Sequence, residues 1–168
     1  VGVLVNTLVA RTNLEGNPDF STVLARTRAV MIDAFDHQDM PFELLVRALQ
    51  PSRDGSRSSL FSVMFNMLNT PPRRADFGGI TCTRFNFDRR AAQFDLTVTI
   101  DVVHDRSICF EYSTDVFARA TVERLAQHYF RILRCVANDI AAPIATAPML
   151  TAEERELLAQ WGRGPSLP

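Results

Sequence analysis

The chain has 168 residues, of which 46% are hydrophobic and 22% are charged, as is ordinary for a globular protein. This length allows one domain with an apolar core. A formal net charge of −1 gives no reason to expect nucleic acid or an anionic membrane as a partner, and no apolar run approaches the roughly 20 residues that a bilayer crossing needs.

The three cysteines, Cys82, Cys109 and Cys135, are odd in number and lack the CxxC spacing of a zinc or redox site. We therefore expect free, buried thiols in a reducing, cytoplasmic compartment. The first residue is a valine inside an apolar run, so we also expect the natural chain to begin further upstream.

Residues 1–11 are almost continuously apolar and β-branched, which predicts a strand buried on both faces. Asn6 is the exception within it. Its side chain either satisfies backbone groups at a bulge or strand end, or it faces a substrate channel; the first is the simpler interpretation. Arg11 at the strand's end is by the same argument a structural ion-pair partner or part of a tunnel wall, and again we favour the first.

Two amphipathic helical patterns follow, at about 18–35 and at 42–49. Asn17 and Pro18 are expected to supply the N-cap and first-turn proline of the first helix. Pro41 disfavours the α conformation at the residue before it and suits the first position of the second helix. Glu43 then lies in the first turn, where its charge faces the positive end of the helix dipole. Residues 37–43 are therefore predicted to be a helix-to-helix corner.

His37 lies at this corner, with Asp39 two residues further on. It is a candidate general base, or it caps the end of the first helix by bonding carbonyl groups, which is the simpler interpretation. His104 and His128 are expected at a hairpin turn and at the boundary of a helix. The sequence has no GxSxG elbow, glycine-rich phosphate loop or metal-ligand spacing.

The second half alternates strands with helices. Residues 51–59 form a polar loop that Arg53 and Asp54 are expected to tie down, with a phosphate site as the alternative. Apolar alternation predicts strands at 60–68, about 80–87, 96–102 and 108–112, the last two forming an antiparallel hairpin. A core-facing stripe predicts a helix at about 120–138, and Thr151 with Glu154 forms a capping box for a helix near 152–161. The pattern indicates an α/β domain.

Three motifs carry a resemblance to a known family. Residues 37–43, His-Gln-Asp-Met-Pro-Phe-Glu, resemble its HQDxPFE motif; residues 1–11 resemble (I/V)GxFVNTxxxR, with Leu4 where Phe is usual; and residues 53–61 resemble RDxSRNPLF, with Ser-Ser replacing Asn-Pro. Phe94-Asp95-Leu96 and residues 112–117 follow in order. Over essentially its whole length, the chain resembles the condensation domains of nonribosomal peptide synthetases.

The resemblance implies an α/β fold, a two-layer mixed sheet with helices, belonging to the C-terminal lobe of a chloramphenicol acetyltransferase-like fold with a tunnel between its lobes. Residues 1–150 would be a partial C-terminal lobe, about 79–95 its crossover (latch), and 151–168 the terminal helix and start of a linker to an adenylation domain. The family's catalytic HHxxxDG motif lies in the N-terminal lobe. No HH pair occurs in this chain, so it is expected to hold no catalytic residue and to be inactive alone.

The parent implied by the resemblance forms an amide bond between acyl or peptidyl and aminoacyl thioesters. Both are carried on the phosphopantetheine of carrier proteins, and no cofactor is bound directly. The implied partners are peptidyl carrier proteins, the N-terminal lobe of the same domain and a downstream adenylation domain, and the isolated fragment is expected to self-associate. The residues implied to line the tunnel or to serve as structural motif residues are Asn6, Arg11, His37, Asp39, Arg53, Asp54, Arg57 and Asp95.

Three alternatives stay open. An epimerisation domain of the same superfamily resembles the chain poorly at residues 37–43. A cyclisation domain would have its defining motif outside the chain. A non-catalytic module that docks carrier proteins belongs to a different functional class.

Overall fold

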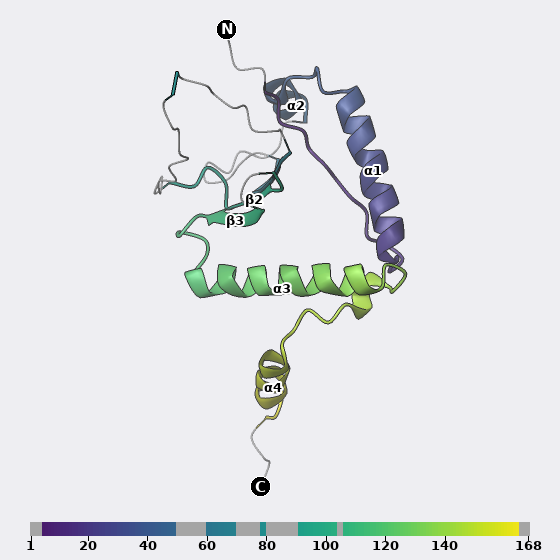
Figure 1. Ribbon diagram of the computed structural model, residues 1–168, viewed down its shortest axis with the longest axis vertical. Helices are drawn as coiled ribbons and strands as arrows, with labels where there is room; N and C mark the ends of the chain where they lie inside the picture. Colours follow the sequence, from purple (N-terminus) through teal and green to yellow (C-terminus); the bar gives the residue numbers. More distant parts are fainter. Residues whose placement is uncertain (1–4, 50–59, 70–77, 80–90, 104–105, 165–168) are drawn as a thin grey trace. The chain divides into compact units, whose positions relative to one another are not determined.

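The computed structural model describes residues 5–49, 60–69, 78–79, 91–103 and 106–164. The described elements, shown in Figure 1, are α1 (Phe20–Asp36), α2 (Phe42–Leu49), β1 (Val63–Leu68), β2 (Leu96–Asp101), β3 (Ser107–Tyr112), α3 (Arg119–Asn138), the short 3-10 helix η1 (Ile144–Thr146) and α4 (Ala152–Trp161). The chain divides into two compact units, Val1–Leu49 with Glu123–Pro168, and Gln50–Val122.

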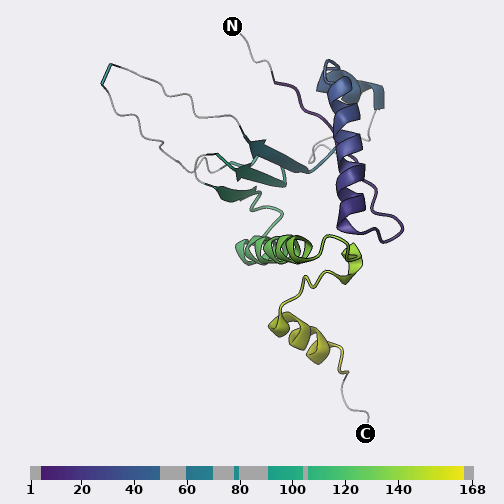
Figure 2. The same ribbon diagram turned by 45° about the vertical axis from the view of Figure 1, so that its right-hand side comes forward.

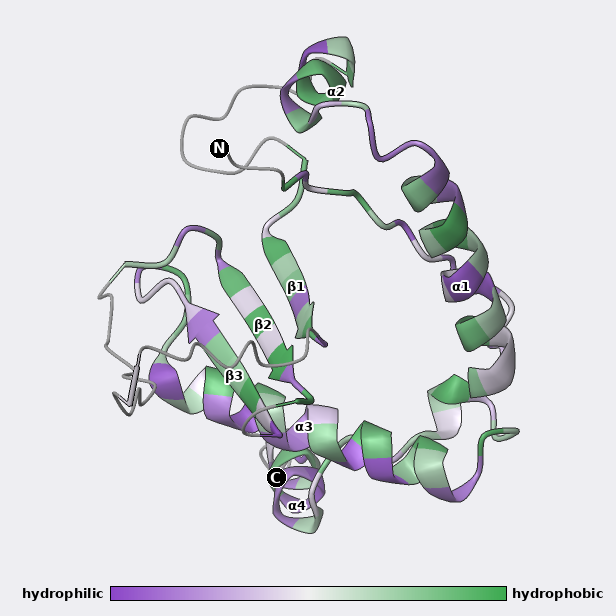
Figure 3. Cartoon of the chain, turned by 45° about the horizontal axis from the view of Figure 1, so that its top comes forward, coloured by the Kyte–Doolittle hydropathy of each residue, from purple (hydrophilic) through white to green (hydrophobic). Residues whose placement is uncertain are grey.

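The described residues of the second unit form a mixed three-stranded sheet in the order β1-β2-β3. β2 pairs in parallel with β1 and antiparallel with β3, so that Leu96 lies beside both Val63 and Tyr112. The predicted hairpin is therefore confirmed. Apolar and polar residues alternate along β2 (Figure 3), and Leu96 and Val98 are buried. The α/β prediction, with a mixed sheet and helices, is correct for the described residues.

β1 is an edge strand with an exposed apolar face. The sequence predicted partial burial of both faces, but Val63, Phe65 and Met67 are 58%, 56% and 56% exposed. Only Met64 within the strand is half-buried. The prediction is wrong for this face because, in the described part of the chain, β1 bonds to β2 alone and nothing covers these three side chains.

The first unit begins with an extended segment rather than a strand. Residues 5–11 join no sheet, and Val5 is 83% exposed. Figures 1 and 2 show this segment running from α2 to the N-terminal end of α1. Beyond the segment, Arg26 of α1 holds the chain by donating from Nη1 to the carbonyl oxygens of Asn13 (2.9 Å) and Glu15 (3.0 Å). The strand prediction is therefore wrong for residues 5–11, which no neighbouring strand of the described chain accompanies.

α1 starts two residues later than the sequence suggested. Its N-cap is Asp19, whose carboxylate accepts from the Thr22 N–H at 2.7 Å. Asn17 has a left-handed backbone (φ 48°), which is incompatible with a helical start. Its side-chain oxygen instead accepts from the Ala145 N–H at 3.0 Å. The predicted N-cap role of Asn17 is wrong. Its side chain instead connects η1 to the segment that directly precedes α1.

α3 and α4 follow their predictions closely. Val122 of α3 is buried, and α4 has the predicted capping box, with Thr151 and Glu154 each bonding the other's backbone N–H. Of the cysteines, Cys135 is half-buried but Cys109 is exposed on β3, so the expectation of burial is wrong for Cys109. Cys82, the predicted strand at 80–87 and most of the predicted crossover lie outside the described residues.

Candidate functional site

The corner at residues 37–43 links two separate helices. α1 ends at Asp36, and His37 caps it with its backbone N–H, which donates to the Phe35 carbonyl. Pro41 stands directly before α2, and its carbonyl accepts from Leu44 N (3.0 Å) and Leu45 N (3.2 Å). Pro41 is thus at the cap position and not, as predicted, at the first helical position. Glu43 lies in the first turn of α2, as expected.

Asn6 binds this corner through its whole side-chain amide. Its Nδ2 donates to the carbonyl oxygens of Gln38 and Met40, each at 2.7 Å. Its Oδ1 accepts from Phe42 N at 3.3 Å and from Thr7 N at 3.0 Å. Two donors and two acceptor positions are the full capacity of an amide, and the N–H groups of a helix's first turn have no partner within the helix. Asn6 therefore satisfies backbone groups, as the first alternative expected, but at the corner rather than at a bulge.

The ring of His37 lies in solvent. Its side chain is 80% exposed, and Nε2 is 3.9 Å from the carboxylate of Asp33, itself 82% exposed. An exposed pair at this distance contributes little energy. The position does cap α1, as expected, but through the backbone N–H and not through ring bonds to carbonyls. The described geometry gives no partner that would orient this ring as a general base.

The other predicted site residues, apart from Asp39 at the corner itself, do not gather at one site with Asn6 and His37 in the described part of the chain. Arg11 and Asp39 are exposed, and the ion pairs found among the described residues do not involve Arg11. Asp95 is half-buried, and its carbonyl accepts from Ser113 N at 3.0 Å, which extends the β2–β3 hairpin by one pair. Arg53, Asp54 and Arg57 lie outside the described residues, as does His104. The structure thus brings Asn6 together with the corner that contains His37 and Asp39.

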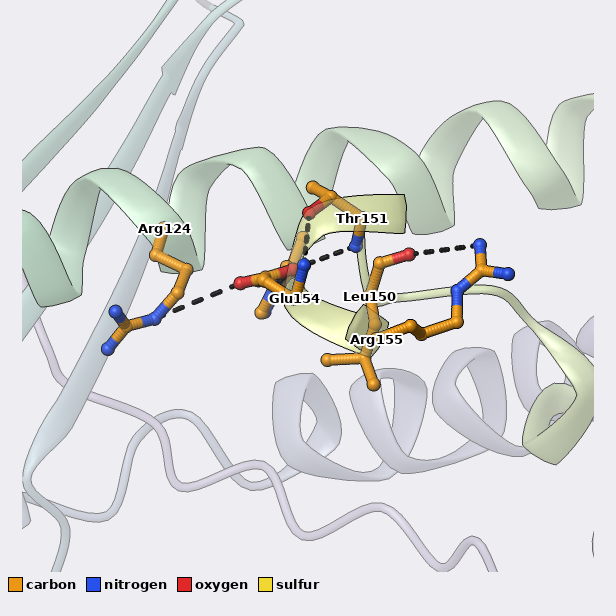
Figure 4. Close-up of polar contacts among 6 residues, drawn as sticks. Arg124, Leu150, Thr151, Glu154 and Arg155 are labelled. Atoms are coloured by element: carbon orange, nitrogen blue, oxygen red, sulfur yellow. Dashed lines mark hydrogen bonds and ion pairs between the residues drawn. The ribbon is translucent and has the colours of Figure 1, made fainter. Parts of the chain in front are cut away.

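Sequence reasoning missed a polar cluster between α3 and α4. Nε2 of His128 lies 2.9 Å from both carboxylate oxygens of Glu154. The same carboxylate accepts from Thr151 N at 2.8 Å and lies 4.0 Å from Nε of Arg124. Figure 4 shows the Glu154 side chain between Arg124 and the start of α4. His128 and Glu154 are each only 19% exposed, so this contact between α3 and α4 is largely shielded from solvent.

The electrostatics of α4's first turn follow from these bonds. The Thr151 N–H, followed by the His128 hydrogen bond, lowers the pKa of Glu154 below its ordinary value. Glu153 also has a lowered pKa, mainly from its own backbone N–H and the Thr151 side chain, with a contribution from Arg131. A carboxylate beside a histidine can orient a base, but here the carboxylate is committed to a helix cap. The capping box was visible in the sequence; its partner His128, 26 positions away, was not.

Neither a metal centre nor a membrane segment emerges from the described residues. They contain no cluster of three or more His, Cys, Asp or Glu side chains that could hold a metal ion. None of the described helices combines the length and hydropathy that crossing a bilayer requires.

Comparison with known proteins identifies the family. The model of the condensation domain matches residues 1–159, so the chain belongs to the condensation-domain family of nonribosomal peptide synthetases. It is 39% identical over 165 residues to a linear gramicidin synthase of Brevibacillus parabrevis and 34% identical over 165 residues to bacitracin synthase 3 of Bacillus licheniformis. These alignments cover 96% and 98% of this chain.

The chain spans only 3% of the length of each of these two synthetases. Among solved structures, it resembles the X-domain from teicoplanin biosynthesis, with a TM-score of 0.70 and 25% identity over 84% of this chain and 33% of that one. It also resembles the complex of that X-domain with OxyB, with a TM-score of 0.67, 24% identity and coverage of 84% and 32%.

Proposed function

We propose that the chain is part of the C-terminal lobe of a chloramphenicol acetyltransferase-like condensation domain that forms amide bonds between carrier-bound thioesters. The acyl or peptidyl donor and the aminoacyl acceptor are each tethered to a carrier protein by phosphopantetheine. In this assignment residues 1–150 form part of the lobe, with about 79–95 as its crossover. Residues 151–168 form the terminal helix and the start of a linker to an adenylation domain.

One observation carries the proposal: the condensation-domain family matches 159 consecutive residues that contain no HH pair. The geometry at the corner also indicates a structural role for this chain rather than a catalytic one. The Asn6 amide is fully used by backbone groups, and the His37 ring is exposed with only Asp33 nearby. Two of the motifs that carry the resemblance therefore meet in a structural contact. Such a piece supplies rigid support for tethered reactants, and holding two reactants together can provide a large share of a rate enhancement.

A segment exchange tests the proposal. The 165 aligned residues of the linear gramicidin synthase are replaced by this chain, and the chimera receives its two loaded carrier proteins. We expect amide product above the uncatalysed rate, because the catalytic motif would come from the host and the lobe from this chain. The matched control carries an unrelated α/β segment of equal length. A folded chimera that makes no more product than this control contradicts the proposal.

A second candidate is a non-catalytic module that binds a partner protein, because the fold is shared with an X-domain whose complex with OxyB has been solved. Such a module would bind a carrier protein by itself. Calorimetric titration of the isolated chain with phosphopantetheinylated carrier protein distinguishes this module from a part of a catalytic condensation domain. Binding by the isolated chain together with an inactive chimera favours the module. An active chimera that epimerises its product instead assigns the chain to the epimerisation type.

A further inference from the structure

α4 is attached to the first unit chiefly at its first turn. In the described chain its polar contacts with α3 include those of Glu154 with His128 and Arg124, and α4 does not pack broadly along α3. Its far half presents apolar side chains to solvent, with Leu158 49% and Trp161 75% exposed. A helix held at one end by polar contacts and uncovered at the other has few interactions that resist rotation about the held end.

The segment before α4 is fixed up to η1. Ile144 N donates to Pro18 O at 2.9 Å, and Ala145 N donates to the Asn17 side chain at 3.0 Å, so η1 is bound to the entry of α1. Residues 148–150 then connect η1 to α4. The bond from Arg155 Nη2 to Leu150 O, 3.4 Å, lies within this end of α4 and does not connect it to η1. The place at which α4 can turn is therefore the short stretch before Thr151.

Glu154 links α4, which follows this short stretch, to α3, which precedes it. Through Thr151 N it completes the cap of its own helix, and through His128 it binds α3. Charge supports the contact, because Arg124, His128 and Arg131 recur at the i, i+4, i+7 spacing of one helix side. The acidic first turn of α4, with Glu153 and Glu154, lies against this row.

We propose that the Glu154 carboxylate is the pivot that sets the direction of α4, and that breaking its contact with His128 releases α4 to swing as an intact, capped helix. The swing moves the apolar end around Leu158 and Trp161. This conformational device is independent of the proposed reaction.

Pulsed electron paramagnetic resonance tests the pivot on the 168-residue chain. Spin labels are placed at Gln127→Cys in α3 and Gln160→Cys in α4, both exposed positions, after the three native cysteines are replaced by alanine. Excess unlabelled chain suppresses distances between copies. We expect one narrow distance distribution, which His128→Ala converts into a broad one. Far-UV circular dichroism should be unchanged, because the capping box remains.

Two matched variants sharpen the result. Thr151→Val removes the hydroxyl that accepts from Glu154 N but leaves the His128 contact. We expect this variant to lose helical signal from α4 and to broaden the distribution only together with that loss, whereas His128→Ala broadens it at constant helical signal. Glu156→Gln neutralises an exposed carboxylate on the same helix that takes no part in the proposed pivot, and it should alter neither the distance distribution nor the helical signal. A narrow distribution in His128→Ala, or a distribution already broad in the parent, would overturn the proposal.

Discussion

The Asn6 contact gives the sharpest stability prediction. Asn6→Ala removes three hydrogen bonds to the corner, those with Gln38 O, Met40 O and Phe42 N. A typical net value is about 0.5–1.5 kcal/mol per bond. Asn6 is exposed, so water can replace part of each bond, and we expect a total loss of about 1–2 kcal/mol in the free energy of unfolding. For a chain of this size, the melting temperature should fall by roughly 5 °C.

Thermal unfolding followed by circular dichroism measures the effect. Asn13→Ala is the matched control, because among the described residues the Asn13 side chain bonds only to Glu15, two residues away. We expect about 0.5 kcal/mol or less for this change. Asn6→Asp keeps the acceptor for Phe42 N but turns a negative oxygen toward two carbonyls, so it should destabilise at least as much as alanine. Equal melting temperatures for Asn6→Ala and Asn13→Ala would refute the idea that Asn6 holds the corner.

Three further outcomes follow from described contacts. His37→Ala in the complete parent should cost about 0.5 kcal/mol or less, because its ring makes one exposed contact at 3.9 Å, and turnover per folded molecule should hold; a collapse of turnover at unchanged stability would reassign His37 to catalysis. The lowered pKa of Glu154 stabilises the fold at pH values above 4.5, the ordinary pKa of glutamate, and this stabilisation is lost as the pH falls through the lowered pKa. In a plot of melting temperature against pH, Glu154→Gln should therefore reduce the fall at acid pH. An unchanged fall would contradict the assignment. The exposed face of β1 should drive self-association, which Phe65→Glu should reduce in light scattering; a monodisperse parent at tens of micromolar would argue against it.

Local sequence signals predicted the helices well. The apolar spacing of α1, α2 and α3 and the capping box of α4 are each encoded within one short stretch, so the pattern alone was sufficient. The β2–β3 hairpin was predictable for the same reason, because its strands are adjacent in sequence. The parallel pairing of β1 with β2 was not predicted, since its strands are separated by 27 positions between Leu68 and Leu96.

The errors have a common physical origin. Residues 5–11 have the composition of a strand, but a strand exists only with a partner, and one segment's sequence cannot show whether a partner is present. The Asn6 contact joins positions 32 to 36 apart, and the His128–Glu154 contact joins positions 26 apart. Neither contact could be predicted without the three-dimensional structure, because each joins residues that are far apart in the sequence. Polar residues at motif positions suggested which side chains matter, but not which backbone groups they bind.

The most direct test of the account is a single-turnover assay of the isolated chain with two loaded carrier proteins at saturating concentration. The account assigns this chain a supporting role without a catalytic residue, so amide product should not exceed the uncatalysed rate, whereas the same carriers with a complete condensation domain should react. Product formed by the isolated chain, and lost in His37→Ala, His104→Ala or His128→Ala, would contradict the account and identify the missing base.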